Sequence, residues 1–332
     1  MALFGKKKKN KIPEISITFT ETINDNSDYS PWNTSKENAD HDFANTIFLG
    51  MYSHKPRPFP ESPDDYPRYV SYELGIYDPV KKFNDLLSGG FIETASERAI
   101  LSTYKVAELK EILESHNLST KGKKDDLLNR KLNEVDLNSL SLPAFYTLSK
   151  KGSDFINQHK DLIKLHNNPY NITYKEYMEV KQQYSYPMPY NDLVWAIFNK
   201  REMEFPIEHN GSRRNNALYR AMLLKSEDRL VDALSYYIIV LYYDVNDHII
   251  REKQHKNLMK SIGEKESEPY PFIVAPHLKE NLLELRSHYI EKMIIRCNDY
   301  LIYPEPKISQ ADFKRLLFDL FNEIEIDIDN YL

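Results

Sequence analysis

Glycine is scarce in this chain, which has only nine glycines among 332 residues. That share is well below the ~7% of an average protein. Neither of the glycine-rich spacings that hold nucleotide phosphates, Gly-x-x-x-x-Gly-Lys-Ser/Thr and Gly-x-Gly-x-x-Gly, occurs in it. The scarcity argues against the common nucleotide-binding enzymes, and it makes each remaining glycine more informative about the turns of the chain.

Cysteine is nearly absent as well, because Cys297 is the single one. A lone cysteine cannot close an intramolecular disulfide, which fits a reducing compartment. Long hydrophobic runs are missing too: the longest apolar patch, Tyr236 to Tyr243, falls far short of the roughly 18 residues of a membrane span. The first residues also lack the apolar region of a secretory signal. We therefore expect a cytoplasmic protein with no membrane span.

Recognisable catalytic spacings are absent from the sequence. It contains no His-Glu-x-x-His, no Gly-x-Ser-x-Gly and no cysteine pair that could bind zinc. Cys297 lies in an apolar helical pattern with Met293 and Ile294, so we expect a buried small residue there rather than a nucleophile. The sequence thus predicts no catalytic residue, no metal ligand, no cofactor and no small-molecule substrate, and we expect a protein that is not an enzyme.

An excess of positive charge is also lacking, since 44 basic and 50 acidic residues give a formal net charge of −6. A chain with this balance does not coat nucleic acid indiscriminately, so any such contact has to be local. The charge is unevenly placed along the chain. Residues 1–11 carry five lysines and no acidic residue, whereas residues 318–332 carry five acidic residues and no basic one.

Sequence patterns divide the chain into a tail, a mixed module and a helical part. Residues 1–41 form a basic tail that we expect to be largely disordered, because a polar Asn/Asp/Ser stretch follows its lysines. Residues 42–165 combine helical and strand patterns. In this module Asp78-Pro79 predicts the start of a helix, and short strands are expected at residues 91–93 and 145–148.

Every strong signal in residues 166–332 is helical, and we expect an all-helical domain there. Its residues 213–262 resemble one tetratricopeptide-like repeat, with Ala221 and Ala233 placed for close helix crossing and Tyr237 as a packing aromatic. The resemblance implies a concave surface for a protein partner, whereas the simpler alternative is a helical core. Amphipathic helices are expected over about 190–203, 213–228, 230–245, 247–262, 276–300 and 309–324.

Two helical patterns separated by a short polar bend occupy residues 103–135. Apolar residues recur at helical spacing over 106–113 and again over 127–132, and between them runs the bend Leu-Ser-Thr-Lys-Gly-Lys-Lys of residues 118–124. This order of helix, lysine-flanked glycine and helix resembles a SAP domain, a small DNA-binding hairpin. Asn117 stands where that family often has glycine, and asparagine also tolerates the left-handed end of a helix.

The bend between the two helices predicts a phosphate-binding corner. Gly122 allows a tight turn, lysines flank it, and the amides that open the second helix lie at its positive dipole end. Such contacts position a nucleic acid without reading its bases, so weak, salt-dependent binding to the phosphate backbone of DNA or RNA is expected. The alternative is a structural or protein-docking hairpin, because residues 103–135 carry seven basic and six acidic side chains. The candidate nucleic-acid-binding residues are Thr120, Lys121, Gly122, Lys123, Lys124 and Arg130.

The segments on either side of the hairpin resemble parts of a winged-helix domain. Residues 83–92 are similar to the end of a recognition-type helix and a first wing strand, and residues 145–152 to a second strand that runs into a helix. If the two strands pair, the hairpin is an insertion at the wing tip. The alternative is a SAP hairpin beside unrelated helices and a small two-stranded sheet. The predicted fold is mainly α, with a SAP hairpin inserted in a winged-helix-like α+β module and an all-helical, tetratricopeptide-like C-terminal domain.

These features together predict a non-enzymatic nucleic-acid-binding accessory protein, with DNA as the expected ligand. The SAP-like hairpin is expected to contact the phosphate backbone, and the helical domain to bind another protein. The composition, rich in Lys, Asn, Ile and Tyr, is similar to that of SAP-domain proteins of low-GC Gram-positive bacteria and their phages. The alternative function is a protein-protein interaction scaffold without direct contact to nucleic acid.

Overall fold

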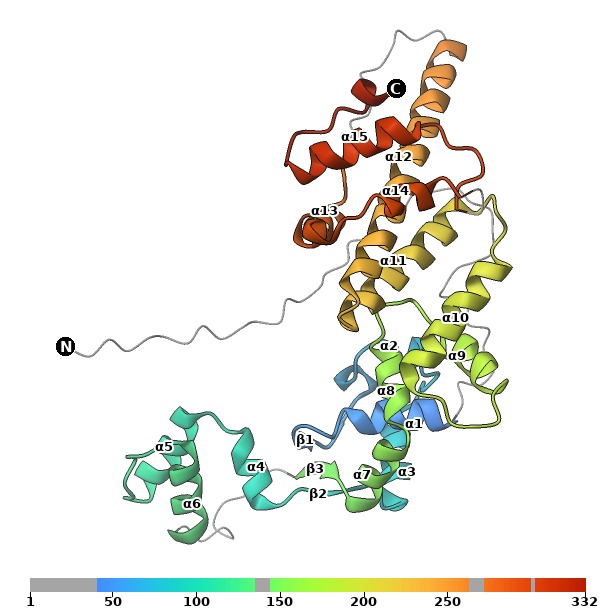
Figure 1. Ribbon diagram of the computed structural model, residues 1–332. Coiled ribbons are helices and arrows are strands. Elements are labelled where there is room, and N and C mark those ends of the chain that lie inside the picture. Colours follow the sequence, from blue (N-terminus) through green and yellow to red (C-terminus); the bar gives the residue numbers. More distant parts are fainter. Residues whose placement is uncertain (1–40, 135–143, 263–271, 300–301) are drawn as a thin grey trace, which may run out of the picture. The chain divides into compact units, whose positions relative to one another are not determined.

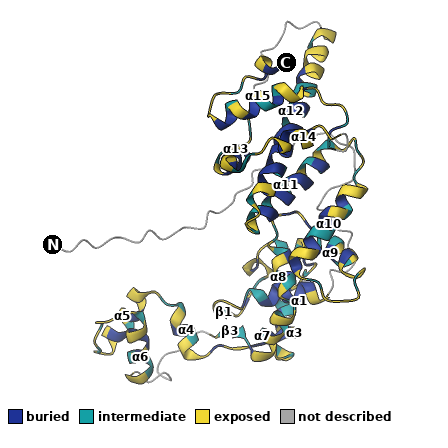
Figure 2. Ribbon diagram, viewed as in Figure 1, coloured by how far each residue is buried: buried dark blue, intermediate teal, exposed yellow. Residues whose placement is uncertain are grey.

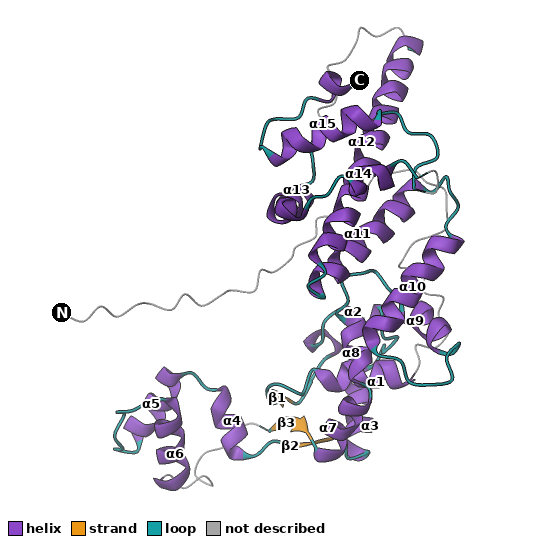
Figure 3. Ribbon diagram, in the orientation of Figure 1, coloured by secondary structure: helices purple, strands orange, loops and turns teal. Residues whose placement is uncertain are grey.

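The computed structural model describes residues 41–134, 144–262, 272–299 and 302–332 (Figure 1). This described part is mainly helical with one small sheet (Figure 3), as the sequence predicts. The predicted basic tail, residues 1–41, lies outside the described residues except for His41, where the first helix begins. No helix in the described part of the chain is long and apolar enough to cross a membrane.

Short helices make up most of the chain before the hairpin. The predicted start at Asp78-Pro79 is confirmed, because the Asp78 carboxylate accepts a hydrogen bond from the Lys81 amide at 2.8 Å and Pro79 takes the first helical position. Phe83 and Leu86 of this helix are buried. The elements are α1 (His41–Gly50), a 3-10 turn at Pro63–Asp65, α2 (Tyr69–Tyr72) and α3 (Pro79–Ser88), of which only α3 was predicted.

The sheet has three antiparallel strands in the order β1-β3-β2. β2 (Ile92–Thr94) and β3 (Phe145–Leu148) pair with Ile92 opposite Leu148 and Thr94 opposite Tyr146, so the two expected strands do pair, which was the condition for an insertion between them. Residues 95–144 are therefore an insertion between two paired strands. The third strand, β1 (Arg57–Pro58), was not predicted; Pro58 has no amide to donate, and an edge strand of two residues tolerates it.

Strand β3 runs directly into a helix, α7 (Lys150–Gln158), and the cap of this helix is hydrogen-bonded to the chain just before β2. Ser149 caps α7 by accepting a hydrogen bond from the Gly152 amide at 3.0 Å, and its hydroxyl donates to the Gly90 carbonyl at 2.6 Å. Gly152 is required because a Cβ at this position would lie 2.1 Å from the Phe91 carbonyl oxygen. The chain then turns at His159 and continues as α8 (Lys160–His166).

A first hydrophobic core joins α1, α3 and α8 to two later helices, α9 (Tyr174–Lys181) and α10 (Tyr190–Glu204). Among its members Phe48, Phe83, Tyr177 and Phe198 are fully buried. This core therefore draws side chains from both sides of residue 165.

All described secondary structure of the C-terminal half is helical, as predicted. The two helices expected over 230–245 and 247–262 are in fact one helix, α12 (Leu230–Ser261), which corrects the prediction of a break near residue 246. The helix expected over 276–300 is instead interrupted after Leu285. The other helices are α11 (Asn210–Ser226), α13 (Pro276–Leu285), α14 (Lys292–Cys297) and α15 (Gln310–Phe321).

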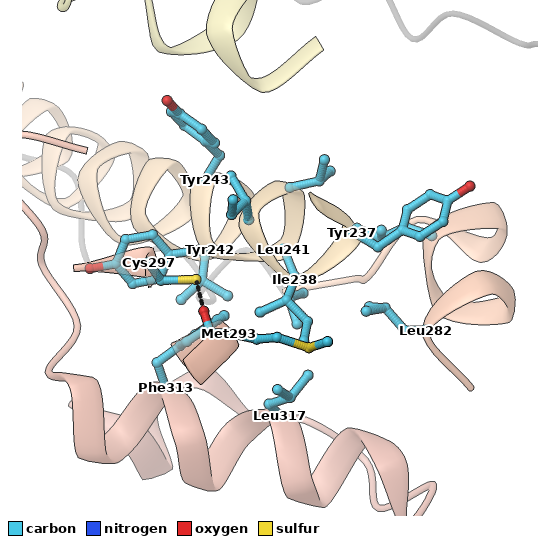
Figure 4. Packing of buried hydrophobic residues seen from close by; sticks show 14 of the residues in the cluster. Tyr237, Ile238, Leu241, Tyr242, Tyr243, Leu282, Met293, Cys297, Phe313 and Leu317 are labelled. Carbon is cyan, nitrogen blue, oxygen red and sulfur yellow. Dashed lines mark hydrogen bonds between the residues drawn. The ribbon is translucent and has the colours of Figure 1, made fainter. Parts of the chain in front are cut away.

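A second hydrophobic core surrounds the first half of α12 (Figure 4). Ala221 and Ala233 are fully buried in it, as expected of small residues where α11 packs on α12. Cys297 is also buried, and burial raises the pKa of its thiol to about 12, so the thiolate needed of a nucleophile is disfavoured at neutral pH. The other residues labelled in the figure are Tyr237, Ile238, Leu241, Tyr242, Tyr243, Leu282, Met293, Phe313 and Leu317.

A buried arginine connects α10, α11 and α12. The Arg220 guanidinium donates to the Phe198 carbonyl at 2.8 Å and to Asn199 Oδ1 at 3.0 Å. Its Cζ also lies 5.8 Å from the ring centroids of both Trp195 and Tyr236. Trp195 packs against both hydrophobic cores, so Arg220 lies where the two cores meet.

Candidate nucleic-acid interface

The inserted segment forms three short helices with a small core of their own. The helices are α4 (Glu97–Thr103), α5 (Val106–Ser115) and α6 (Lys124–Glu134). α4 was not predicted, whereas α5 and α6 match the two predicted helical patterns. Their buried leucines form one hydrophobic cluster that consists of Leu101, Leu109, Leu113, Leu127 and Leu128. This cluster holds the bend between α5 and α6 in place.

A left-handed residue ends α5, as the sequence suggests. Asn117 has a φ of 57°, and the Leu118 amide donates to the Leu113 carbonyl at 2.8 Å. This is the hydrogen bond of a helix end that reverses through a left-handed residue. Asparagine adopts that conformation more readily than most residues, so the departure from the family pattern leaves the hairpin geometry intact.

Gly122 has the backbone conformation that the sequence analysis assigned to it. Its φ is 124°, a region that residues with a side chain rarely adopt. A Cβ at this position would also lie 2.8 Å from the Cβ of Asp126. The Asp126 carboxylate accepts a hydrogen bond from the Lys123 amide at 2.8 Å, so it takes one of the amides that we expected to face a phosphate. Positive charge at the bend must therefore come mainly from side chains.

The six candidate residues fall into two groups. Lys121 and Lys123 are exposed, and no carboxylate of the described residues lies within ion-pair distance of either ammonium group. Lys124 is tied to the end of α4, because its Nζ donates to the Ser102 carbonyl at 2.7 Å. Arg130 is tied to the bend itself, donating to the Ser119 carbonyl at 2.7 Å and the Lys121 carbonyl at 2.9 Å.

These contacts give the candidate residues different tasks. Lys121 and Lys123 are exposed at the bend. Arg130 holds the loop that carries them. Lys124 joins α6 to α4, and its positive charge lies close to the bend. Thr120 is half-buried in the same loop. The hairpin is thus built to present two lysines on a rigid turn rather than a continuous basic surface.

One basic residue of the hairpin is hidden, which the sequence analysis missed. Lys131 is fully buried, and its ammonium has no hydrogen-bond partner within the described residues. It lies 5.4 Å from the centroid of the Tyr104 ring. Burial lowers the pKa of this lysine, because the charged form is poorly solvated. Its position in the stripe of Leu127 and Leu128 was the sequence signal, since residues three and four apart share a helix face.

The burial of Lys131 changes the charge that the hairpin shows to a ligand. Seven basic and six acidic side chains were counted over residues 103–135, and without Lys131 the two numbers are equal. Asp125 and Asp126 lie in the first turn of α6, next to the lysines of the bend. Attraction for phosphate is therefore confined to the edge that carries Lys121 and Lys123, and it is expected to be weak and strongly screened by salt.

The described residues offer no metal-binding alternative to the bend. They hold no group of three or more His, Cys, Asp or Glu side chains that could bind a metal ion. The hairpin bend therefore remains the best candidate for a functional site among the described residues.

Comparison with known protein families matches residues 100–130 to the SAP domain. The match covers about a tenth of the chain, and it begins inside α4, slightly earlier than the predicted start at residue 103. No curated protein and no solved structure matches the chain. The winged-helix-like flanks, the tetratricopeptide-like repeat and the bacterial or phage origin stay predictions. The α4–α6 segment is a SAP domain, which is a general DNA-binding motif, carried as an insertion between the paired strands β2 and β3.

Proposed function

We propose that this protein is a non-enzymatic accessory protein that binds the phosphate backbone of DNA through the bend of its SAP domain. The observation that carries the proposal is the presentation of Lys121 and Lys123, both exposed, on a loop that Arg130 holds through two backbone hydrogen bonds and whose turn uses the positive φ of Gly122. The SAP match at residues 100–130 supports DNA as the ligand. Contacts from these side chains read charge and position rather than base sequence.

A numerical expectation follows from the number of lysines. Each phosphate neutralised on duplex DNA contributes about 0.9 to the slope of log affinity against log salt concentration. Two lysines therefore account for a slope of roughly two. Through these two lysines alone, lowering the salt concentration from 1 M to 0.1 M raises the affinity about 60-fold. A contribution of this size is enough for measurable binding and too small for tight binding by the hairpin alone.

The helical C-terminal half is proposed to bind a protein partner. This function, without any nucleic-acid contact, is also the second candidate for the whole chain. The equal numbers of basic and acidic side chains on the surface of the hairpin favour it. It predicts that purified protein binds neither duplex DNA nor single-stranded DNA nor RNA, while the full chain with Lys121 and Lys123 replaced by alanine retains a partner in a pull-down.

The test is a binding titration of the full chain with a mixed-sequence DNA duplex, single-stranded DNA and RNA between about 50 and 200 mM salt. Replacing Lys121 and Lys123 by alanine should lower the salt slope for duplex DNA by about two. Lys105 and Lys110 provide the matched control, because they are exposed on the same hairpin and their replacement removes the same charge. An equal effect of both double variants would contradict a specific role of the bend.

A second control concerns the five lysines of residues 1–11. They can bind nucleic acid through charge alone, so the titration is repeated with these residues deleted. The proposal requires that the loss caused by replacing Lys121 and Lys123 persists in this shorter chain. If deletion of residues 1–11 alone abolishes binding, the SAP bend is rejected as the principal contact.

A further inference from the structure

The long helix α12 changes character along its length. Its 32 residues give it a length of about 48 Å. Residues 233–246 are almost all buried in the second core, residues 247–250 are half-buried, and most side chains from Arg251 to Ile262 are exposed (Figure 2). Three turns of helix thus continue beyond the core that supports the first half. A helical segment this short is only marginally stable alone, so the packed half of α12 nucleates it.

This exposed end carries more positive charge than the SAP hairpin. Residues 251–262 contain four basic side chains and one acidic one. Lys253, Lys256 and Lys260 follow one another at spacings of three and four, which places them on one face of the helix. We call these three residues the α12 basic face.

The only acidic side chain in this segment does not neutralise the whole face. Glu252 is buried, and one of its oxygens lies 2.9 Å from the Lys256 ammonium. In the described part of the chain, no carboxylate lies within ion-pair distance of Lys253 or Lys260. Within the described residues both ammonium groups are therefore left for an anionic partner, and the Glu252–Lys256 pair stabilises the helix that carries them.

The composition of the opposite side argues against a membrane surface as the partner. Leu258 and Ile262 lie there, 58% and 57% exposed. Two apolar side chains bury too little area to hold an amphipathic helix in a lipid interface, which normally relies on a continuous apolar stripe. Phosphates spaced along a duplex match a row of lysines on a straight helix more closely, because a helix of 10–12 Å diameter fits the major groove of about 12 Å width.

We propose that the α12 basic face is a second contact for the backbone of duplex DNA, in addition to the bend of the SAP domain. The proposal rests on the function proposed above in that it assigns the same ligand to both surfaces. It also explains how a hairpin with no net surface charge can belong to a DNA-binding chain. Two weak contacts on one molecule bind more tightly than either alone, because the second contact forms at a high effective concentration.

The experiment uses the full chain and four variants. One replaces Lys253 and Lys260 by alanine, one replaces Lys121 and Lys123, and one combines the four changes. The matched control replaces Lys279 and Lys292, two exposed lysines on α13 and α14. Alanine is the best helix former, so the helices should persist, and circular dichroism verifies this. Affinity for a mixed-sequence DNA duplex is measured between about 50 and 200 mM salt.

We expect the Lys253/Lys260 variant to lower the salt slope by about two and to weaken binding by up to about 60-fold at 0.1 M salt, with little change in the Lys279/Lys292 control. An effect no larger than that of the control, while the Lys121/Lys123 variant still weakens binding, overturns this inference and leaves the proposed function intact. The reverse pattern retains α12 as a contact and rejects the SAP bend. Binding of the unaltered chain to phosphatidylserine vesicles but not to DNA overturns both.

Discussion

The buried lysine of the SAP hairpin allows a quantitative prediction about stability. A buried polar group without a hydrogen-bond partner typically costs about 1–3 kcal/mol, and more when it is charged. The Lys131 ammonium has no such partner among the described residues. Its position over the Tyr104 ring returns about 2 kcal/mol at a desolvated site. Replacing Lys131 by methionine keeps a long, unbranched side chain and removes the charge. We therefore expect this variant to stabilise the hairpin by about 1–2 kcal/mol at neutral pH.

The pH dependence of hairpin stability shows independently that the charged form of Lys131 is destabilising. Burial lowers the pKa of Lys131 in the folded hairpin below its ordinary value of 10.5, so the unfolded chain binds a proton more tightly than the folded one. The penalty for the charged form is complete below the folded pKa. Stability then increases as the pH rises from the folded pKa to 10.5, because the lysine loses its proton in the folded state first. The methionine variant lacks this increase.

The assay is amide hydrogen exchange of Leu109, Leu113, Leu127 and Leu128 in the full chain, corrected for the intrinsic effect of pH on exchange. Protection of these core amides reports the local stability of the hairpin. Replacing Lys110 by methionine is the control, since this lysine is exposed on the same hairpin and its loss should change stability by less than about 0.5 kcal/mol. A loss of protection in the Lys131 variant would refute the reasoning. So would a reduced salt slope of DNA binding, because a buried charge should not contribute to it.

Two further substitutions test the backbone and the junction of the cores. Gly122→Ala should lower hairpin stability by about 2 kcal/mol, because its φ of 124° strains any side chain and the new Cβ meets Asp126; unchanged protection of the hairpin amides would contradict this. Arg220→Ala should destabilise the chain by about 2–3 kcal/mol in thermal unfolding, since hydrogen bonds from a buried charged group to Phe198 and Asn199 are lost. Arg229→Ala is the control, because this arginine is about half exposed and its ion pairs are worth about 1 kcal/mol or less, while its guanidinium lies 5.8 Å from the Trp195 ring, as that of Arg220 does. Equal effects of the two arginine variants would show that Arg220 is not a structural link.

The SAP hairpin could be predicted from the sequence because its determinants are local. Helical spacing of leucines, a glycine with positive φ and an asparagine at a helix end all act within about 30 residues. The roles of individual basic residues were less accessible. Arg130 binds carbonyls of the bend, and Lys124 reaches the end of α4, a helix that the sequence analysis did not predict. Which lysines face solvent depends on these contacts.

The break predicted within α12 was wrong for an instructive reason. Polar residues at positions 244, 246 and 247 interrupt the apolar pattern of the sequence. In the structure Asn246 is buried, and its Oδ1 accepts hydrogen bonds from the Lys307 and Ile308 amides at 2.5 and 3.3 Å. Asp247 nearby accepts from the Tyr303 hydroxyl at 2.9 Å. These partners lie some 60 residues away in the sequence, so no local pattern reveals them.

The sheet was predicted only in part for a similar reason. The β2–β3 pairing follows from two short apolar runs, whereas β1 consists of Arg57 and Pro58, which have little strand propensity of their own. Its pairing with β3 is decided by neighbouring structure rather than by its own composition. The α12 basic face could not be predicted for a related reason. The exposed end of α12 becomes visible only when burial is known for each residue of the helix.

The insertion of the SAP domain between β2 and β3 also affects how the chain folds. Bringing Thr94 next to Tyr146 closes a loop of about 50 residues, and each doubling of loop length costs about 0.6 kcal/mol of entropy. If α4 to α6 fold first around their own leucines, the number of residues between the strands that are not yet ordered at that stage of folding falls to about a quarter, which lowers this cost by about 1.2 kcal/mol. Formation of the hairpin thus favours formation of the sheet. A ligand that stabilises the hairpin must then also favour the strand pairing at its base.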